Sequence, residues 1–393
     1  MLVSSAEKGH FNPLVGPAQW LRRLGHDVGW LCVPETPAQI QSIDVEALRM
    51  PGHVEAPPLE TSGRALAALV RDPDALRRWI RMLLLDGVPA QVDPVREVVR
   101  AWEPDVVALD GMVYQGVIAA RLEGVPFAGV SSALTLLEPA GFDSDLLRTV
   151  RSLAADRARL FASYGLSESF RTCECLSPLG NFVFATASLV GDDAPLPPAT
   201  ALVGPSIAPA ARGDETPFDW ELLDPGKPLV YASFGSQIWY QPETFAQVAQ
   251  AVQSLDAQLV LSAGGLAGSE WARALPGSPV VVRYAPQREL LARAAAFVTH
   301  GGANSVMEAL SAAVPLLVLP VCNDQPLQAH YVTRAGAGLA LAPHEVTREA
   351  IQDALGHLLR DDRVRARVAT IAADYRAHDG ARAAAERIAR LAT

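Results

Sequence analysis

The sequence lacks long apolar runs, although half of its 393 residues are hydrophobic. No uninterrupted apolar stretch approaches the roughly 20 residues that a membrane-spanning helix needs. The N-terminus also lacks the basic-then-apolar order of a signal peptide. We therefore expect a cytoplasmic protein without a membrane span. The opening "MLVSS" leaves only a few residues for a first strand, so the alternative that the sequence begins inside a longer strand stays open.

Cysteine is scarce, and no surface of positive charge is evident. The four cysteines are too few and too scattered for a disulfide framework or a zinc site, so we expect reduced thiols. Among the four cysteines, only Cys173 and Cys175 are spaced like a metal-binding pair. The formal net charge is −10, and the Arg-rich segments at 148–159 and 360–390 alternate with Asp, Glu and Ala. Because such a chain repels phosphate backbones, we expect no nucleic-acid partner.

Short β-like runs alternate with helical patterns along most of the chain, which is typical of parallel sheets covered by helices. We expect strands at 26–33, 105–110, 126–132, 228–233, 257–263, 278–284, 295–300 and 314–320. We expect helices at 112–123, 242–254, 287–293, 303–313, 325–335, 347–359 and 362–391. A Pro- and Gly-rich stretch near 205–225 reads as a linker, and the length suits two α/β domains on either side of it.

The stretch "AAAFVTHGGANSVMEAL" (294–310) runs from an expected strand through His300, Gly301 and Gly302 into an expected helix. The glycines permit close backbone approach, and a helix N-terminus offers free N–H groups to an anion such as a phosphate. Ser305 and Glu308, however, also match a capping box, which closes a helix without any ligand. Gly235 and Ser236 form a second turn that should face the same crevice.

Residues 284–326, "YAPQRELLARAAAFVTHGGANSVMEALSAAVPLLVLPVCNDQP", resemble the donor-binding signature of family 1 nucleotide-sugar glycosyltransferases. The resemblance implies a GT-B fold, with two Rossmann-like doubly wound domains facing a cleft. It implies an acceptor-binding domain at 1–210, a donor-binding domain at 211–375, and a C-terminal helix at 376–393 that packs back on the first domain. Plant members have Trp in place of Tyr284 and Ala303, so the departures suggest a bacterial branch.

The same resemblance assigns roles to the residues of the second domain. Tyr284 would stack on the base, Gln287 would lie beside the nucleoside, and Glu308 would bind the ribose. His300, Gly302, Asn304 and Ser305 would hold the diphosphate, together with Ser236 from the other turn. Asp324 and Gln325 would bind the sugar hydroxyls, as in members that use glucose. The implied co-substrate is a UDP- or dTDP-sugar, and we favour UDP-glucose, with no cofactor and no metal.

The segment "EKGHFNPLVGPAQWLRRLGH" (7–26) resembles the opening of the same family, whose histidine is the catalytic base. Asn12 and Pro13 suit an N-cap and a first helical residue, so His10 is expected just ahead of a helix, and Pro17 is expected to start or kink the regular helix. Asp110 ends an expected strand, at the place of the family's histidine partner, although an Asp before glycine is also a common turn.

The resemblance implies an inverting displacement at the anomeric carbon, with His10 as general base, supported by Asp110. Apolar residues at 77–93 and 131–142 suit either an acceptor pocket or core packing. "LFASYGL" and "CLSPLG" resemble the zeaxanthin glucosyltransferase branch, which favours a hydrophobic hydroxylated acceptor such as a polyketide, polyene or aromatic compound. We expect a monomer or homodimer. Asp143 and Asp145 match a metal-binding DxD but follow no strand, so we read them as a solvated loop.

Two other classes of function stay open at this stage. Nucleotide-sugar 2-epimerases have the same two-domain architecture and are isomerases without an acceptor. A non-catalytic donor-binding helper protein would bind the nucleotide without turnover. His10 with Asp110, beside a full donor signature, favours the transferase.

Overall fold

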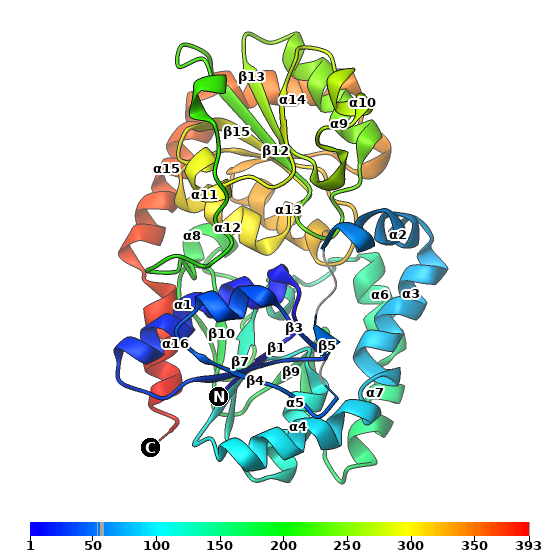
Figure 1. Ribbon diagram of the computed structural model, residues 1–393, viewed down its shortest axis with the longest axis vertical. Helices are drawn as coiled ribbons and strands as arrows, with labels where there is room; N and C mark the ends of the chain where they lie inside the picture. Colours follow the sequence, from blue (N-terminus) through cyan, green and yellow to red (C-terminus); the bar gives the residue numbers. More distant parts are fainter. Residues whose placement is uncertain (53, 56–58, 393) are drawn as a thin grey trace.

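Two parallel β-sheets, one in each half of the chain, form the centres of two domains stacked along the long axis of the molecule (Figure 1). The computed structural model describes residues 1–52, 54–55 and 59–392. Every expected strand has a counterpart in one of the two sheets, so the predicted doubly wound α/β architecture is confirmed. Among the residues described, no helix is long and apolar enough to cross a membrane.

The sheet of the first domain has the strand order β11-β10-β7-β6-β1-β2-β4, and its strands are parallel. Its strands are β1 (Leu2–Ser4), β2 (Gly29–Cys32), β4 (Glu46–Leu48), β6 (Val107–Asp110), β7 (Phe127–Ser131), β10 (Asn181–Val183) and β11 (Thr200–Leu202). The strand order reverses between β1 and β6. At such a switch point the loops that follow the two strands diverge and leave a crevice for ligands.

The second domain repeats this plan with the order β14-β13-β12-β15-β16-β17. Its strands are β12 (Leu229–Ser233), β13 (Gln258–Ser262), β14 (Val280–Val282), β15 (Ala294–Thr299), β16 (Leu316–Val318) and β17 (Gly338–Ala340). The switch point lies between β12 and β15, whose carboxyl ends lead into the two glycine turns noted in the sequence. Two small additional sheets pair β3 (Glu35–Thr36) with β5 (Val54–Glu55) and β8 (Ser169–Arg171) with β9 (Glu174–Leu176).

Helices surround both sheets (Figure 1). The first domain contains α1 (Lys8–Arg23), α2 (Leu59–Arg71), α3 (Pro73–Arg81), α4 (Pro89–Trp102), α5 (Tyr114–Leu122), α6 (Asp145–Ser152), α7 (Ala154–Ala162) and α8 (Ala187–Val190). The second contains α9 (Pro242–Gln253), α10 (Glu270–Arg273), α11 (Gln287–Leu291), α12 (Ala303–Ser311), α13 (Gln325–Arg334) and α14 (Arg348–Arg360). The single helix expected at 362–391 is two helices, α15 (Asp362–Ala377) and α16 (Gly380–Ala389).

The start of α1 differs from the sequence expectation. The helix begins at Lys8, so His10 lies in its first turn and both Pro13 and Pro17 lie inside it. A proline leaves the carbonyl four residues earlier without its helical donor. Here those carbonyls bond elsewhere: the Gly9 oxygen lies 3.4 Å from Asn304 Nδ2, and the Pro13 oxygen accepts a 2.6 Å bond from Ser206 Oγ. The two prolines thus leave acceptors on α1 for the segments that face it.

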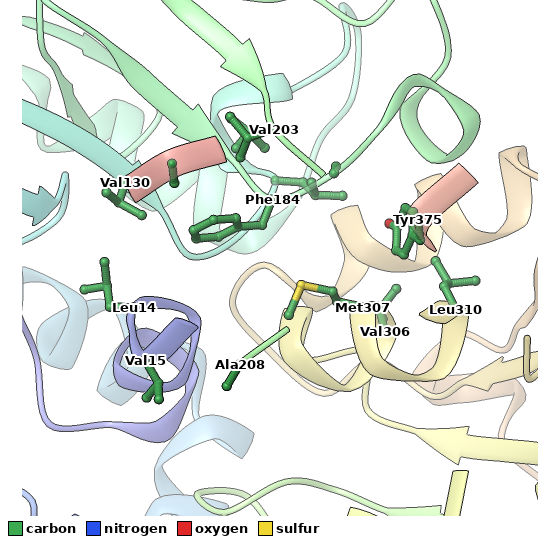
Figure 2. Packing of buried hydrophobic residues seen from close by; sticks show 14 of the residues in the cluster. Leu14, Val15, Val130, Phe184, Val203, Ala208, Val306, Met307, Leu310 and Tyr375 are labelled. Atoms are coloured by element: carbon green, nitrogen blue, oxygen red, sulfur yellow. The ribbon is translucent and has the colours of Figure 1, made fainter. Parts of the chain in front are cut away.

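Buried apolar side chains from both domains pack against each other in the region between the two sheets (Figure 2). Met307 of α12 projects toward the first domain, and its sulfur accepts a bond from the Ser206 backbone nitrogen. Tyr375 of α15 and Phe184, after β10, belong to the same cluster. The chain passes between the domains at 203–219 and again between α15 and α16. The second passage returns α16 onto α1, where a Cβ on Gly16 would meet the Ala381 Cβ at 2.7 Å.

Candidate active site

A cavity of about 480 Å³ lies between the domains, and both switch points open into it. Gly9 and Asn12 of α1 line it from the first domain, while Ser236 and His300 line it from the ends of β12 and β15. The sequence predicted the two turns separately. The shared topology of the domains brings their crevices face to face.

His10, Asp110 and Ser132 form one hydrogen-bonded group at the switch point of the first domain. His10 Nδ1 lies 2.5 Å from Asp110 Oδ2, and Ser132 Oγ lies 3.0 Å from the same carboxylate oxygen. The backbone nitrogen of Met112 donates to Asp110 Oδ1 over 2.9 Å. Asp110 is buried, whereas the His10 side chain is 30% exposed. This arrangement fixes the Nδ1 edge of the imidazole and leaves Nε2 for a substrate.

The charges of this group favour a protonated histidine. Burial works against the imidazolium, but the Asp110 carboxylate, by its charge and its hydrogen bond, raises the pKa of His10 to about 9. Burial likewise opposes the charge of Asp110, and His10 together with the donors from Met112 and Ser132 lowers the pKa of that carboxyl below its usual value. A strong ion pair results, of the kind that tunes a histidine for proton transfer.

The His300 ring lies so close to the backbone of the two turns that only glycine fits beside it at positions 235 and 302. A Cβ on Gly302 would lie 2.5 Å from His300 Nε2, and one on Gly235 would lie 2.8 Å from His300 Cε1. Gly235 also has a φ of +73°, in the left-handed region that favours glycine. Burial lowers the pKa of His300 to about 4, so the ring is neutral at pH 7 and offers a single N–H donor.

The capping-box interpretation of Ser305 and Glu308 is wrong. The helix α12 begins at Ala303 with Gly302 as its N-cap, so Ser305 is the third helical residue and Glu308 lies in the second turn. Glu308 is buried and forms an ion pair with Arg212, while Gln287 Nε2 donates to its other oxygen over 2.9 Å. Glu308 therefore has side-chain partners inside the cavity, and the first N–H groups of α12 have no side-chain cap.

Tyr284, the expected base-stacking residue, is covered by a lysine of the first domain. Lys8 Nζ lies 4.0 Å from the centroid of the Tyr284 ring and 2.6 Å from its hydroxyl oxygen. Asp214, in the passage between the domains, accepts a 2.9 Å bond from Lys8 and forms a second ion pair with Arg212. Tyr284 and Glu308, the residues expected to bind the base and the ribose, are thus bordered by two cations, each paired with a carboxylate.

The remaining predicted donor residues line the same cavity or lie beside it. Asn304 Nδ2 donates to the Lys8 carbonyl oxygen over 2.9 Å, and this bond joins the domains. Gln325, which lines the cavity, accepts through Oε1 from the backbone nitrogens of Val321 and Cys322 and donates through its amide nitrogen to Cys322 Sγ over 3.7 Å. Asp324 is close enough to His10 for their charges to interact, although burial raises the pKa of Asp324. The structure therefore brings both sets of predicted residues to one place.

Sequence reasoning missed several polar residues of this region. Ser132 follows β7, the strand next to β6, and the alignment of parallel strand ends was the signal that would have placed it beside Asp110. Lys8 directly precedes the Gly-His turn, but nothing in its spacing indicated Tyr284 as a partner. Arg212 and Asp214 lie in the stretch read as a linker, where the absence of periodicity conceals a contact with the site.

One wall of the cavity is apolar. Leu66 and Val70 of α2, Trp79 of α3 and Ile238 line it. Trp79 belongs to the 77–93 stretch for which a pocket and a core were both considered, and most other apolar residues of that stretch pack in the core.

Asp143 and Asp145 both pair with Arg148, and Ser144 between them caps α6. In the described part of the chain, no three His, Cys, Asp or Glu side chains are grouped to hold a metal ion.

Comparison with known proteins gives the same result from independent information. Residues 215–376 match the family described as UDP-glucoronosyl and UDP-glucosyl transferase. The NDP-glycosyltransferase YjiC of Bacillus subtilis (strain 168) is 26% identical over 389 residues, 98% of this chain and 95% of the relative. The zeaxanthin glucosyltransferase of Pseudescherichia vulneris is 26% identical over 68% of each chain.

The fold has close counterparts among solved structures. The glycotransferase of kitacinnamycin superposes with a TM-score of 0.77 at 22% identity, over 100% of this chain and 98% of that one. This structural similarity shows the fold alone. The similarity to glycosyltransferases in sequence comes from the family match and from the full-length relatives. The chain therefore contains a family 1 glycosyltransferase domain at residues 215–376, its full length is similar to bacterial glycosyltransferases, and its fold is GT-B.

Proposed function

We propose that the chain transfers a hexose, glucose from UDP-glucose, to a hydroxyl group of a hydrophobic small-molecule natural product, with inversion at the anomeric carbon. The observation that supports this most directly is the 2.5 Å contact between His10 and Asp110, next to Gly9, which lines the interdomain cavity. A transferase needs a base on the acceptor side and an anion site on the donor side. We assign the base to the switch point of the first domain and the anion site to that of the second.

The proposed base is the neutral imidazole of His10. With Nδ1–H donating to Asp110, Nε2 accepts the proton of the acceptor hydroxyl as its oxygen attacks the anomeric carbon. The bond from that carbon to the diphosphate oxygen breaks on the opposite face, so the configuration inverts. Asp110 stabilises the imidazolium that forms and is not itself protonated. Ser132 holds the carboxylate oxygen that faces the histidine.

The proposed leaving-group site is the N-terminus of α12. Its uncapped N–H groups and positive dipole end suit a diphosphate, and His300 adds a donor. Lys8 and Arg212 contribute positive charge in the same cavity. We therefore propose that negative charge on the leaving group is stabilised without a metal ion and without a cofactor.

Several observations support the choice of the proposed substrates. UDP follows from the description of the matching family, and a hydrophobic acceptor is consistent with the apolar wall formed by Leu66, Val70 and Trp79. The zeaxanthin glucosyltransferases among the relatives, by their names, glucosylate an apolar natural product. We assign the sugar hydroxyls to Asp324 and Gln325 on the resemblance of 284–326 to the family's donor signature.

The test is incubation with UDP-glucose and a panel of flavonoid, polyene and macrolide alcohols. Mass spectrometry should detect an acceptor heavier by one hexose, and the NMR coupling of the anomeric proton should report a β-linkage. His10→Ala should abolish the product, while the surface variant Asp143→Asn should keep it. A new sugar nucleotide without an acceptor product would contradict the proposal and support an epimerase.

A further inference from the structure

A second buried carboxyl lies close to the proposed base, and the mechanism above gives it no part. Glu174, on β9, is 4% exposed. Its oxygen Oε1 lies 2.8 Å from Ser131 Oγ and also contacts the hydroxyl of Thr135. The two side chains that hydrogen-bond to Glu174 thus do so through neutral hydroxyl groups, whereas Asp110 is paired with a histidine.

The count of hydrogens indicates how Glu174 bonds to Ser131. The Ser131 hydroxyl has one proton, but two acceptors lie at 2.8 Å, the carbonyl oxygen of Ala133 and Glu174 Oε1. Both contacts are satisfied if Glu174 is itself protonated and donates to Ser131 Oγ, while Ser131 donates to Ala133. The hydroxyl of Thr135 then donates to Glu174.

This network reaches the proposed base through two routes. The bond from Ser131 to Ala133 closes a short turn around Ser132, whose hydroxyl lies 2.9 Å from His10 Nδ1. The neighbouring residue Cys175 donates its backbone N–H to the carbonyl oxygen of Gly111, directly after Asp110, over 2.8 Å. A Cβ on Gly111 would lie 3.0 Å from the Glu174 Cβ. Glu174 therefore contacts or lies beside the chain neighbours of both residues that hold His10, namely Ser131 before Ser132 and Gly111 after Asp110.

We propose that Glu174 is a positioning residue that acts as a neutral carboxylic acid: by donating to Ser131 it fixes the turn that presents Ser132 to His10 and Asp110. The inference rests on the proposed function, in which His10 is the base. A neutral acid at this place adds no further negative charge beside the His10–Asp110 pair.

The electrostatic surroundings agree with this geometry. Burial raises the pKa of Glu174 to about 8, and the Asp110 charge on β6 contributes to the increase. The hydroxyl groups and His10 on α1 act in the opposite direction. The adjacent Cys173 thiol is also buried, with a pKa raised well above its usual value, so it remains neutral.

The ionisation of Glu174 has a definite sign in the pH dependence of stability. Its folded pKa is raised from 4.5, so between pH 4.5 and about 8 the folded state must keep a proton that the unfolded state releases. The wild-type protein loses stability across this range. Glu174→Gln keeps a neutral donor, because its amide nitrogen can donate to both hydroxyls, and it avoids this loss.

The experiment compares melting temperatures of wild type and Glu174→Gln from pH 5 to pH 8. We expect the variant to melt higher at pH 8, by about 3 °C or more, and the difference to shrink as the pH falls toward 5. Glu123→Gln is the matched control, because Glu123 pairs with Arg96 and Arg100 at the surface, and it should not melt higher at any pH. A lower melting temperature for Glu174→Gln at pH 8 would overturn the proposal, since it would mean an ionised acceptor.

The positioning role is tested on His10 itself. An NMR titration should give Glu174→Ala a His10 pKa at least one unit below wild type, and kcat of the transfer reaction should fall about tenfold, with recovery in Glu174→Gln. An unchanged titration and unchanged kcat in Glu174→Ala would overturn the role. If wild type transfers no hexose, the proposed function fails, yet the melting and NMR series still decide the state and role of Glu174.

Discussion

Replacing Asp110 by Asn removes the charge on which the proposed base depends. Asp110 raises the pKa of His10 from its usual 6.5 to about 9. At about 1.36 kcal/mol per pKa unit, this net shift corresponds to about 3 kcal/mol in favour of the imidazolium, after the opposing effect of burial and with smaller contributions from Glu7 and Asp324. The amide also loses its preference for Nδ1–H, so the base edge at Nε2 is no longer defined. We expect kcat/KM to fall by about 10²- to 10⁴-fold.

The assay is kcat/KM as a function of pH between 6 and 10. In wild type, deprotonation of His10 should raise the rate about tenfold per pH unit and then level off near pH 9, because the neutral imidazole is the active form. Asp110→Asn should lose this alkaline rise. Ser132→Ala is the matched control, since it removes one hydroxyl but keeps the charge, and its rise should remain. Superposable profiles for wild type and Asp110→Asn would refute the reasoning.

The same ion pair predicts how stability depends on pH. The folded pKa of His10 is raised, so the stabilisation is complete below pH 6.5 and disappears as the pH passes about 9. Asp110→Asn should therefore lower the melting temperature more at pH 6 than at pH 10. An equal decrease at both values would mean that the pair adds no stability in the folded state.

Three further variants test the donor side and the domain contact. Glu308→Gln should weaken UDP-glucose binding about tenfold in calorimetry and lower the melting temperature, because buried Arg212 loses its paired charge; unchanged affinity would exclude ribose binding by Glu308. Lys8→Ala should bind uridine about threefold more tightly, since it uncovers the face of Tyr284 and a cation over a ring contributes about 0.5–1 kcal/mol; weaker binding would mean that the ring is not the stacking surface. Met307→Ala should cost about 2–4 kcal/mol in denaturant unfolding, and a loss below 1 kcal/mol would mean that the apolar contact between the domains adds little.

Much of the fold was predictable because apolar strands in a parallel sheet are short, continuous and buried. The segments that became β12, β13 and β15 have this pattern. The strands β4, β10, β11 and β17, each at or next to the edge of a sheet, were missed; each has three residues, too few to show a period. The start of α1 was misplaced since Asn12 and Pro13 fit an N-cap rule that the backbone did not need to follow.

The candidate site was predictable only where local sequence and family pattern coincide. His10 lies in the first turn of the helix that follows β1, and Asp110 ends β6, so the parallel pairing of these two strands brings them together. Glu174 lies on the second strand of the β8–β9 hairpin, and no repeat or motif in the sequence marks this hairpin. Arg212 contacts Glu308 from a stretch without secondary structure. Such contacts depend on how the domains are stacked, which is a property of the whole chain.

The two passages of the chain between the domains meet at one point. The backbone nitrogen of Gly380 donates to the Pro205 carbonyl oxygen over 3.1 Å, and a Cβ on Gly380 would lie 2.0 Å from the Gly204 oxygen. Both covalent connections therefore cross beside each other, with backbone against backbone. A movement that widened the cavity between the domains would therefore bend both connections at the same place. The bond from Asn304 to Lys8, which joins the two domains, would break if they moved apart.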